Sequence, residues 1–444
     1  MKVLVIGSGA REHALVTALS ADPQVDAVIA APGNPGMATT ARCEPVDPLD
    51  PAAVTDLARQ HSVDLVVVGP EGPLVAGVAD AVREAGIPCY GPSAQAARLE
   101  GSKAFAKEVM AAAECPTGMG RLCTTMAEVA DALDAFGAPH VVKDDGLAAG
   151  KGVVVTDDRA EALAHAEQCL AKDGGAVVIE EFLDGPEVSL FVLCDGTDVV
   201  PLVPAQDFKR VGDGDTGPNT GGMGAYSPLP WAPEGLVDDL VARVAQPVVT
   251  EMARRGTPFI GTLYIGLALT SRGPKVIEFN ARFGDPETQV VLARLRSPLG
   301  QLLYAAATGS LADQPELRWS EQAAVTVVMA AENYPGTPRS GDVIDGLADV
   351  GEVPTAYVLH AGTADGPDGT VVSAGGRVLS VVALGADLEQ ARERVYAAVE
   401  RVSFADCHAR SDIALKAVRG EIADPNPSAR PPHPEAGAAA TMEA

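Results

Sequence analysis

The stretch Lys275-Val-Ile-Glu-Phe-Asn-Ala-Arg-Phe-Gly-Asp-Pro-Glu-Thr-Gln289 joins a predicted β-strand to a polar turn. Its first half is rich in β-branched and aromatic residues, which favour a strand. Alternate side chains of a strand share a face, so Glu278 and Asn280 are expected on the same side. A carboxylate and an amide oxygen placed in this way suit Mg²⁺. Arg282 is expected to point the same way, before Gly284-Asp-Pro286 ends the strand. A strand with a plain polar face would show the same pattern, so glycine-rich loops elsewhere must support a metal–phosphate site.

The first of these loops follows a short apolar run near the N-terminus. Residues 3–6 predict a buried strand, Gly7-Ser-Gly-Ala-Arg-Glu-His13 a turn, and the residues after the turn a helix. Backbone N–H groups at such a helix start bind anions. Glu12 replaces the third glycine of a dinucleotide fingerprint, and the next predicted strand, 27–30, ends without an acidic residue. The loop is therefore predicted to bind a simple phosphate rather than NAD.

A second loop, Gly69-Pro-Glu-Gly-Pro73, follows the predicted strand 64–68. Strands that alternate with helices predict an open parallel sheet, and ligands bind such sheets at the carboxyl ends of the strands. Both loops lie at this edge. Glu71 could bind sugar hydroxyls there, although a lone glutamate in a turn is also common on a solvated surface.

The middle of the chain shows a strand, a glycine-rich loop and a second strand around Lys143-Asp-Asp-Gly-Leu-Ala-Ala-Gly-Lys-Gly152. Such a loop can fold over a triphosphate, with N–H groups and lysines meeting the oxygens. It is not a P-loop, because Gly152 stands where that motif needs Ser or Thr. A glycine hairpin with a stray lysine is the alternative. The apolar strand that runs into Glu180 could offer backbone groups to an adenine and a carboxylate to its ribose.

Residues 206–226 form a long glycine-rich segment without a strand or helix pattern. Loops of this length are usually functional or disordered. Regular elements are predicted close on both sides, so a functional loop is favoured over disorder.

Composition limits the classes of partner. The chain has 444 residues, 47% of them hydrophobic, and a formal net charge of -27. The acidic excess argues against nucleic acid or an anionic membrane as a partner. No apolar run has the length of a transmembrane helix, and the run after Lys2 is too short for a signal peptide. The seven cysteines are scattered and form no CxxC pair, which indicates a reducing, cytoplasmic compartment.

Taken together, these segments resemble the phosphoribosylamine–glycine ligases of purine biosynthesis, which are ATP-grasp enzymes. The resemblance covers about residues 1–419. Its most specific parts are the runs 217–226 and 283–289, and the full set of matching runs is Gly9-Ala-Arg-Glu-His13, Ala31-Pro-Gly-Asn34, Val68-Gly-Pro-Glu71, Leu99-Glu-Gly-Ser-Lys103, Asp145-Gly-Leu-Ala-Ala-Gly-Lys-Gly152, Gly217-Pro-Asn-Thr-Gly-Gly-Met-Gly-Ala-Tyr226 and Phe283-Gly-Asp-Pro-Glu-Thr-Gln289.

The resemblance implies that ATP lies between two β-rich lobes. Lys103 and Lys143 would meet its phosphates, and the loop 146–152 would cover them. Mg²⁺, or Mn²⁺, would bind Glu278 and Asn280. The implied nucleotide-binding residues are Lys103, Lys143, Gly146, Gly150, Lys151, Gly152, Glu180, Glu181, Phe182, Leu183 and Glu187.

The resemblance also implies where the other substrates bind. The phosphate of phosphoribosylamine would lie at Gly9–Arg11 and its ribose at Glu71, with Asp207 and Lys209 closing over it. Arg282 would neutralise developing charge and is one candidate for holding glycine. The implied catalytic residues are Arg282, Lys143, Asp207 and Lys209, and the implied substrate-binding residues are Gly9, Ala10, Arg11, Glu71, Asp207, Lys209, Arg282, Asp285 and Pro286.

Three positions and one strand depart from the family pattern. Ala10 stands where glycine is frequent, and Asp144 adds a negative charge next to Lys143. Phe208 stands where histidine is common, so no catalytic role is assigned to it. The preceding strand, 263–269, lacks the second metal-binding acid of many ATP-grasp enzymes, which leaves the metal shell incomplete.

The expected fold is a multidomain α/β and α+β protein with an open parallel sheet first, a two-lobed ATP-grasp clamp next and a small α/β domain last. The predicted boundaries are an N-terminal substrate domain at 1–101, an ATP-grasp domain at 102–310 (linking helix 102–115, smaller lobe 116–190, larger lobe 191–310), a C-terminal domain at 320–420 and a disordered tail at 421–444.

The predicted reaction is ATP-dependent ligation of glycine to phosphoribosylamine through a glycyl phosphate, in a monomeric enzyme. Two alternatives remain at this stage. One is another ATP-grasp ligase such as a biotin-dependent carboxylase, although no biotinyl-lysine segment is present in the sequence. The other is a nucleotide-binding module without catalysis. The predicted strand with Glu278 and Asn280 and the glycine loops, all of which are intact, argue against this alternative.

Overall fold

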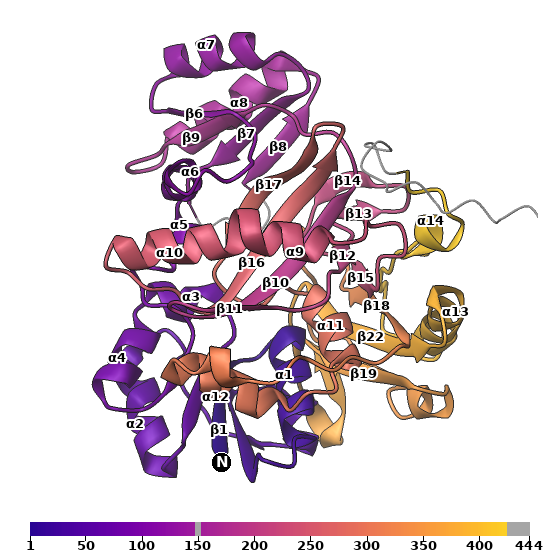
Figure 1. Ribbon diagram of the computed structural model, residues 1–444. Helices are drawn as coiled ribbons and strands as arrows, with labels where there is room; N and C mark the ends of the chain where they lie inside the picture. Colours follow the sequence, from indigo (N-terminus) through magenta and orange to yellow (C-terminus); the bar gives the residue numbers. More distant parts are fainter. Residues whose placement is uncertain (147–151, 424–444) are drawn as a thin grey trace, which may run out of the picture.

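The computed structural model of the chain describes residues 1–146 and 152–423 (Figure 1). Gly150 and Lys151 of the predicted phosphate loop, and residues 424–444 of the predicted tail, lie outside these ranges. Within them the chain forms a parallel sheet at the N-terminus followed by antiparallel sheets. The predicted fold class is therefore confirmed.

The N-terminal region is a five-stranded parallel sheet in the order β3-β2-β1-β4-β5. Its central strand β1 carries Val3, Leu4, Val5 and Ile6, all fully buried, as expected for a parallel strand covered on both faces. The elements are β1 (Lys2–Gly7), α1 (Ala10–Ser20), β2 (Ala27–Pro32), η1 (Met37–Thr39), β3 (Arg42–Cys43), α2 (Pro51–His61), β4 (Leu65–Val68), α3 (Glu71–Val75), α4 (Val78–Glu84) and β5 (Cys89–Tyr90).

Two short helices lead from this sheet to a small four-stranded antiparallel sheet, which forms the smaller lobe at the top of Figure 1. Its strand order is β6-β9-β7-β8, and α7 and α8 share a separate apolar core with it. The elements are α5 (Arg98–Gly101), α6 (Lys103–Ala112), β6 (Gly120–Cys123), α7 (Met126–Phe136), β7 (His140–Asp144), β8 (Val153–Thr156), α8 (Arg159–Leu170) and β9 (Val177–Glu180).

The larger lobe is built on a second antiparallel sheet in the order β11-β10-β16-β17. Strand β17 contains the Glu278 and Asn280 pair and lies at the edge of this sheet, next to β16. The elements are β10 (Glu187–Asp195), β11 (Val199–Pro201), α9 (Leu236–Leu240), η2 (Val241–Ala245), α10 (Gln246–Arg254), β16 (Ile260–Thr270), β17 (Gly273–Asn280), α11 (Glu287–Arg294), α12 (Leu299–Thr308) and η3 (Leu311–Asp313).

The last sheet has the order β12-β15-β18-β22-β19 and combines two distant parts of the chain. Its members β12 and β15 belong to the segment 206–226 that the sequence predicts as a loop, and β15 pairs with β18 about a hundred residues later. The prediction of a structureless loop was wrong, because partners far away in sequence supply the hydrogen bonds. The elements are β12 (Gln206–Asp207), β13 (Arg210–Gly212), β14 (Thr216–Asn219), β15 (Gly224–Ser227), β18 (Ala323–Ala330), η4 (Asp349–Glu352), β19 (Ala356–His360), β20 (Thr363–Asp365), η5 (Pro367–Gly369), β21 (Val371–Ser373), β22 (Arg377–Gly385), α13 (Leu388–Val399) and α14 (Leu415–Val418).

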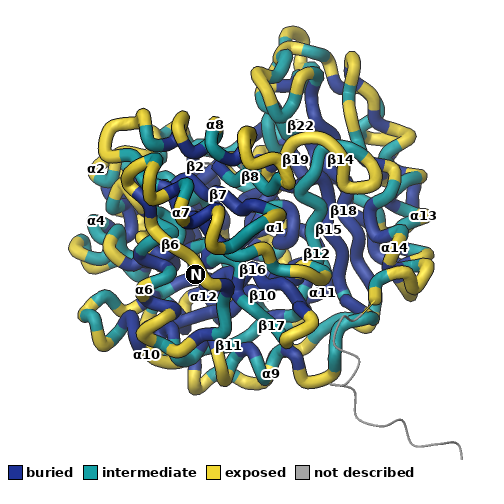
Figure 2. Tube along the Cα trace, turned by 90° about the horizontal axis from the view of Figure 1, so that it is seen from above, coloured by how far each residue is buried: buried dark blue, intermediate teal, exposed yellow. Residues whose placement is uncertain are grey.

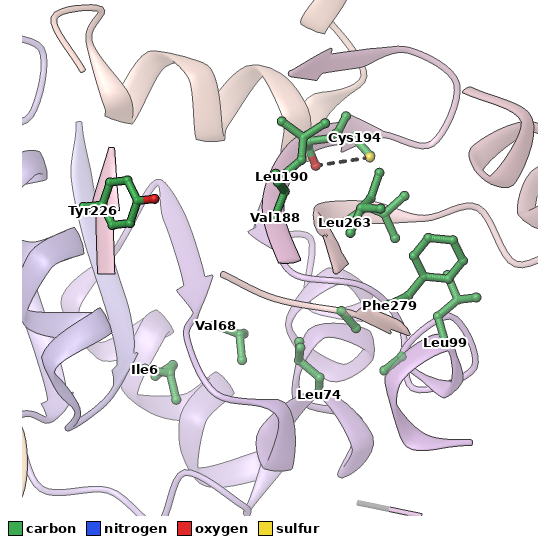
Figure 3. Packing of buried hydrophobic residues seen from close by; sticks show 14 of the residues in the cluster. Ile6, Val68, Leu74, Leu99, Val188, Leu190, Cys194, Tyr226, Leu263 and Phe279 are labelled. Atoms are coloured by element: carbon green, nitrogen blue, oxygen red, sulfur yellow. Dashed lines mark hydrogen bonds between the residues drawn. The ribbon is translucent and has the colours of Figure 1, made fainter. Parts of the chain in front are cut away.

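One apolar core runs through several of these layers. Ile6 and Val68 of the parallel sheet, Leu190 and Leu263 of the larger lobe, and Tyr226 of the last sheet belong to the same cluster (Figure 3). Every residue of β18 is buried, and Figure 2 shows this strand in dark blue. The continuous core fixes the sheets relative to one another, and with them the loops at their edges.

Candidate active site

The N-terminal glycine loop is organised around the carboxylate of Glu12. This side chain accepts a hydrogen bond of 2.7 Å from the backbone N–H of Gly9 and forms an ion pair with Arg11. It also occupies the space beside Gly69, where a Cβ would lie 2.1 Å from its Oε1. Both predicted loops therefore meet at one buried carboxylate. Arg11 also donates to the carbonyl of Phe283 at 3.2 Å, so it links the loop to the stretch that follows β17.

Arg282 lies between two carboxylates from different elements. Its guanidinium is 3.4 Å from Glu71 and 2.8 Å from Glu100. Burial alone would raise the pKa of Glu71, but Arg282 and Arg11 hold it below its usual value. For Glu100 burial outweighs the attraction of Arg282, and the pKa is raised. The structure thus brings the predicted residues Glu71 and Arg282 together.

Sequence reasoning gave no role to Glu100. Its second carboxylate oxygen accepts the backbone N–H of Ala281 at 2.8 Å, so it fixes the chain directly before Arg282. The signal was present in the sequence, because Glu100 lies in the run Leu99–Lys103 that resembles the family.

Lys103 and Lys143 lie near β17, the strand that carries Glu278. Lys143 donates to the carbonyl of Ile277 at 3.1 Å, and Lys103 donates to that of Gly146 at 3.0 Å. Burial lowers the pKa of Lys103, and the nearby carboxylate of Glu278 opposes this shift. Two cations and a carboxylate therefore lie close together between the lobes, which suits a polyphosphate with its metal ion.

Glu180 joins two of the lysines of this region. Its buried carboxylate lies 2.8 Å from Lys143 and 3.0 Å from Lys107. Burial opposes ionisation, but the two ammonium groups hold the pKa of Glu180 below its usual value. Lys107 was missed by the sequence analysis, although it lies four residues after Lys103 on α6 and therefore on the same helix face.

The rest of the predicted adenine segment lies at the end of β9. Glu181 pairs with Lys275 at 3.2 Å and Arg272 at 3.3 Å, while the side chain of Phe182 is 45% exposed and Leu183 follows it in an irregular segment. Asp144 pairs with Lys172. Gly146 and Gly152 border the residues that the structure does not describe.

Glu278 and Asn280 both lie on β17, opposite Gly266 and Tyr264 of β16. The pairing register with β16 shifts between Val276 and Glu278, which interrupts the alternation of side chains between the two sheet faces before Glu278. From Glu278 to Asn280 the pairing is regular, so these two side chains share one face of the sheet. In residues 1–146 and 152–423 there is no group of three His, Cys, Asp or Glu side chains arranged to hold a metal ion. One carboxylate and one amide fit Mg²⁺ that takes its remaining oxygen ligands from phosphate and water.

Lys209 lies between two carboxylates that the sequence assigned to different ligands. It forms ion pairs with Glu187, predicted at the nucleotide ribose, and with Asp207 at 3.4 Å. Burial, together with the charges of Glu287 and Glu187, raises the pKa of Asp207 to about 7 against the opposing effect of Lys209. Asp207 can therefore gain or lose a proton near neutral pH.

Asp285 and Pro286 lie beside the N-terminal loop. One carboxylate oxygen of Asp285 is 3.7 Å from the position that a Cβ of Gly9 would occupy, and the other accepts from Gln289 at 2.8 Å. The run 283–289 therefore meets the N-terminal glycine loop at Asp285, and Gly222 of the run 217–226 packs against Pro286.

Comparisons with known proteins identify the family. The N domain, the ATP-grasp (A) domain and the C domain of phosphoribosylglycinamide synthetase match residues 1–100, 101–288 and 324–416. The chain belongs to the phosphoribosylglycinamide synthetase family. A phosphoribosylamine–glycine ligase of Streptomyces coelicolor is 67% identical over 419 residues, which cover 94% of this chain and 99% of the relative. One of Mycobacterium bovis is 59% identical over 427 residues, covering 95% and 100%.

Solved structures agree with this assignment. The crystal structure of phosphoribosylamine–glycine ligase from Thermotoga maritima has a TM-score of 0.80 at 30% identity, covering 93% of this chain and 100% of that chain. The biotin carboxylase domain of Hydrogenobacter thermophilus 2-oxoglutarate carboxylase, a complex with MgADP and bicarbonate, has a TM-score of 0.68 at 20% identity, covering 92% and 91%. The second likeness shows the shared ATP-grasp fold alone. The resemblance predicted from the sequence is confirmed. None of the helices in the described ranges is long and apolar enough to cross a membrane.

Proposed function

We propose that this protein ligates glycine to 5-phosphoribosylamine with ATP, giving glycinamide ribonucleotide, ADP and phosphate, in de novo purine biosynthesis. The observation that carries the proposal is the position of two lysines in a chain of this family. Lys143 bonds to the carbonyl of Ile277 directly before Glu278, and Lys103 bonds to the carbonyl of Gly146 in the segment that follows Lys143. All seven cysteines are unpaired, which supports a reducing, cytoplasmic compartment.

The chemistry begins with the weak reactivity of a carboxylate as an acyl donor. Its leaving group would be oxide, and transfer of the γ-phosphoryl group to glycine replaces this with phosphate. The 1-amino group of phosphoribosylamine then attacks the glycyl carbonyl and phosphate leaves. A protein assists such transfers by positioning the reactants and neutralising charge.

Specific residues would supply these two effects. Lys103 and Lys143 would hold the phosphate oxygens, and Gly146 to Gly152, with Lys151, would cover them. Mg²⁺, for which Mn²⁺ could substitute, would be held by Glu278 and Asn280 and would supply charge neutralisation. Adenine and ribose would bind along Glu180–Leu183 and at Glu187.

Phosphoribosylamine would bind at the edge of the parallel sheet. Its phosphate would lie at Gly9–Arg11, its ribose at Glu71, and Asp285 and Pro286 would border both. Arg282 would neutralise the charge that develops on the acyl group. Asp207 and Lys209 would close over the amine. Asp207, whose pKa is raised to about 7 mainly by burial, would take up a proton there.

The test replaces one metal ligand by its isostere. In Glu278→Gln, ADP release with glycine and freshly prepared phosphoribosylamine is expected to fall about 100-fold or more, since a metal contact is worth several kcal/mol of transition-state stabilisation. Glu389→Gln, an exposed position on α13, serves as the matched control and should retain wild-type turnover.

Omitting substrates separates the competing functions. Near-normal turnover of Glu278→Gln would refute the metal assignment. ADP release by the wild-type protein that needs bicarbonate instead of glycine would indicate a carboxylase. Nucleotide binding without ADP release under any of these conditions would indicate a non-catalytic module.

A further inference from the structure

The side chain of Arg377 reaches from the C-terminal sheet into two loops of the candidate site. It lies at the start of β22, and its Nη1 donates to the carbonyls of Gly221 and Asp285, each at 2.7 Å. Its Nη2 lies 3.2 Å from the carboxylate of Asp285. One guanidinium therefore joins the segment after Lys209 to the segment after Arg282, using the several donors that only arginine offers in a planar fork.

Gly221 and Gly222, in the segment after Lys209, must be glycines for this arrangement to form. A Cβ on Gly221 would lie 3.1 Å from Cζ of Arg377. Gly222 has a φ of +114°, and a Cβ there would lie 2.4 Å from Cδ of Pro286. The loop thus presses its backbone directly against both the guanidinium and the proline. A second residue of the C-terminal region, Tyr334, accepts the N–H of Gly221 at 2.9 Å through its hydroxyl.

The carboxylate oxygen of Asp285 that pairs with Arg377, Oδ2, also faces the N-terminal glycine loop. Because its carboxylate oxygen comes within 3.7 Å of a Cβ position on Gly9, an unpaired Asp285 would repel an anion held by that loop. Burial favours its neutral form, but Arg377 and Arg11 hold the pKa of Asp285 below its usual value. The carboxylate is therefore charged, and Arg377 compensates that charge.

We propose that Arg377 is a positioning residue for the phosphorylated sugar substrate: it neutralises Asp285 beside the phosphate loop and fixes Gly221–Gly222 against Pro286. This inference rests on the proposed function and adds to it a residue of the C-terminal domain. The nucleotide site, formed by Lys103, Lys143 and β17, contains none of the atoms that Arg377 contacts. Loss of Arg377 should therefore affect the sugar ligand and spare the nucleotide.

The test measures binding of glycinamide ribonucleotide and of a non-hydrolysable ATP analogue by calorimetry. In Arg377→Ala the dissociation constant for glycinamide ribonucleotide is expected to rise about tenfold or more, equivalent to about 1.4 kcal/mol, with ATP-analogue affinity within about twofold of wild type. Guanidinium ion added to Arg377→Ala should restore part of the lost affinity, because it can occupy the same donor positions. Arg339→Ala is the matched control, since Arg339 pairs with Glu332, Asp342 and Asp406 within the same domain.

Other outcomes overturn the inference. Wild-type affinity for glycinamide ribonucleotide in Arg377→Ala would do so, as would an equal loss for both ligands. Should Arg377→Ala not fold, Arg377→Lys keeps the charge without the fork and is expected to show the same selective loss. If the wild-type protein binds no glycinamide ribonucleotide and forms none from glycine and phosphoribosylamine, the proposed function itself fails. If the wild-type protein binds glycinamide ribonucleotide and Arg377→Ala binds it equally well, only the role of Arg377 is refuted and the proposed function stands.

Discussion

Phe208 separates the two residues proposed to close over the amine, yet its own contacts lie elsewhere. The guanidinium of Arg410 lies 4.9 Å from the centre of its ring, and the ring of Tyr226 lies 6.2 Å away. Asp207 and Lys209, in contrast, pair with each other at 3.4 Å. The ring therefore packs against Arg410 and Tyr226, and its identity should matter for stability more than for catalysis.

The corresponding prediction concerns Phe208→His, which introduces the residue common in the family pattern. We expect kcat to stay within about twofold, and the free energy of unfolding to fall by about 1–2 kcal/mol, because an imidazole loses apolar burial and cation–π attraction beneath Arg410. ADP-release kinetics and urea unfolding measure the two effects. Phe208→Leu, which keeps the apolar bulk, is the control. A tenfold fall in kcat at unchanged stability would contradict this assignment.

His408 and Arg410 hold the hairpin of β13 and β14 in place. His408 bonds to the carbonyl of Val211 at 2.7 Å through its Nε2, and Arg410 donates to that of Arg210 at 3.0 Å. Arg410 is almost fully buried and pairs with Asp215 at 3.0 Å and with Asp412 at 2.8 Å. A two-stranded hairpin is marginal by itself, so these contacts decide its order.

Removing Arg410 should therefore loosen the hairpin. For Arg410→Ala we expect a loss of about 3 kcal/mol in the free energy of unfolding, because a large buried side chain leaves a cavity and Asp215 and Asp412 lose their partner. We also expect faster amide exchange in residues 210–219. Lys416→Ala, which breaks an exposed pair with Asp215, should cost less than about 1 kcal/mol. Denaturant titration and hydrogen–deuterium exchange test both variants. Equal costs for the two would show that Arg410 acts as an ordinary surface charge.

At the scale of the whole molecule, two histidines join the first and last domains. The backbone N–H of His360 in β19 donates to Nδ1 of His13 in α1 at 2.8 Å, and both side chains are buried. Burial and the nearby His360 lower the pKa of His13 to about 3, and burial lowers the pKa of His360 to about 4. Both rings are neutral in the folded protein at pH 7, and Nδ1 of His13 serves as an acceptor.

This pair makes the domain contact sensitive to acid. Below the ordinary histidine pKa of about 6.5, His13 and His360 are protonated in the unfolded chain but stay neutral in the folded protein. The free energy of unfolding therefore falls as the pH drops from about 6.5 toward 4 and 3. At pH 5 each histidine should cost about 2 kcal/mol relative to pH 7. In His360→Gln one such contribution disappears. The free-energy difference from wild type, measured by urea unfolding, should therefore shift by about 2 kcal/mol in favour of the variant between pH 7 and pH 5. An identical difference at both pH values would contradict a neutral buried pair.

Much of this architecture could be predicted from local patterns. The apolar run of residues 3–6 predicted a strand buried on both faces, and β1 is one. The spacing of Glu278 and Asn280 placed both on one strand, which β17 confirms. The family resemblance rested on contiguous runs such as 217–226, and it was confirmed by the comparisons. The roles assigned to individual site residues stay predictions.

The residues missed by sequence reasoning have partners that lie far away in the chain. Glu100 contacts Arg282, and Arg377 contacts Gly221, across gaps of more than a hundred residues. The loop prediction for 206–226 failed for the same reason, because β15 finds its partner in β18.

The sequence by itself determined the strands, helices and glycine turns that have a local pattern, such as β1 and β17, and the family to which the chain belongs. It did so because alternation, helical spacing and contiguous motifs are properties of neighbouring residues. Only the tertiary structure decided that Asp285 is paired with Arg377 and that His13 meets His360. Such contacts depend on the path of the whole backbone around its common core, and no local period in the sequence encodes that path.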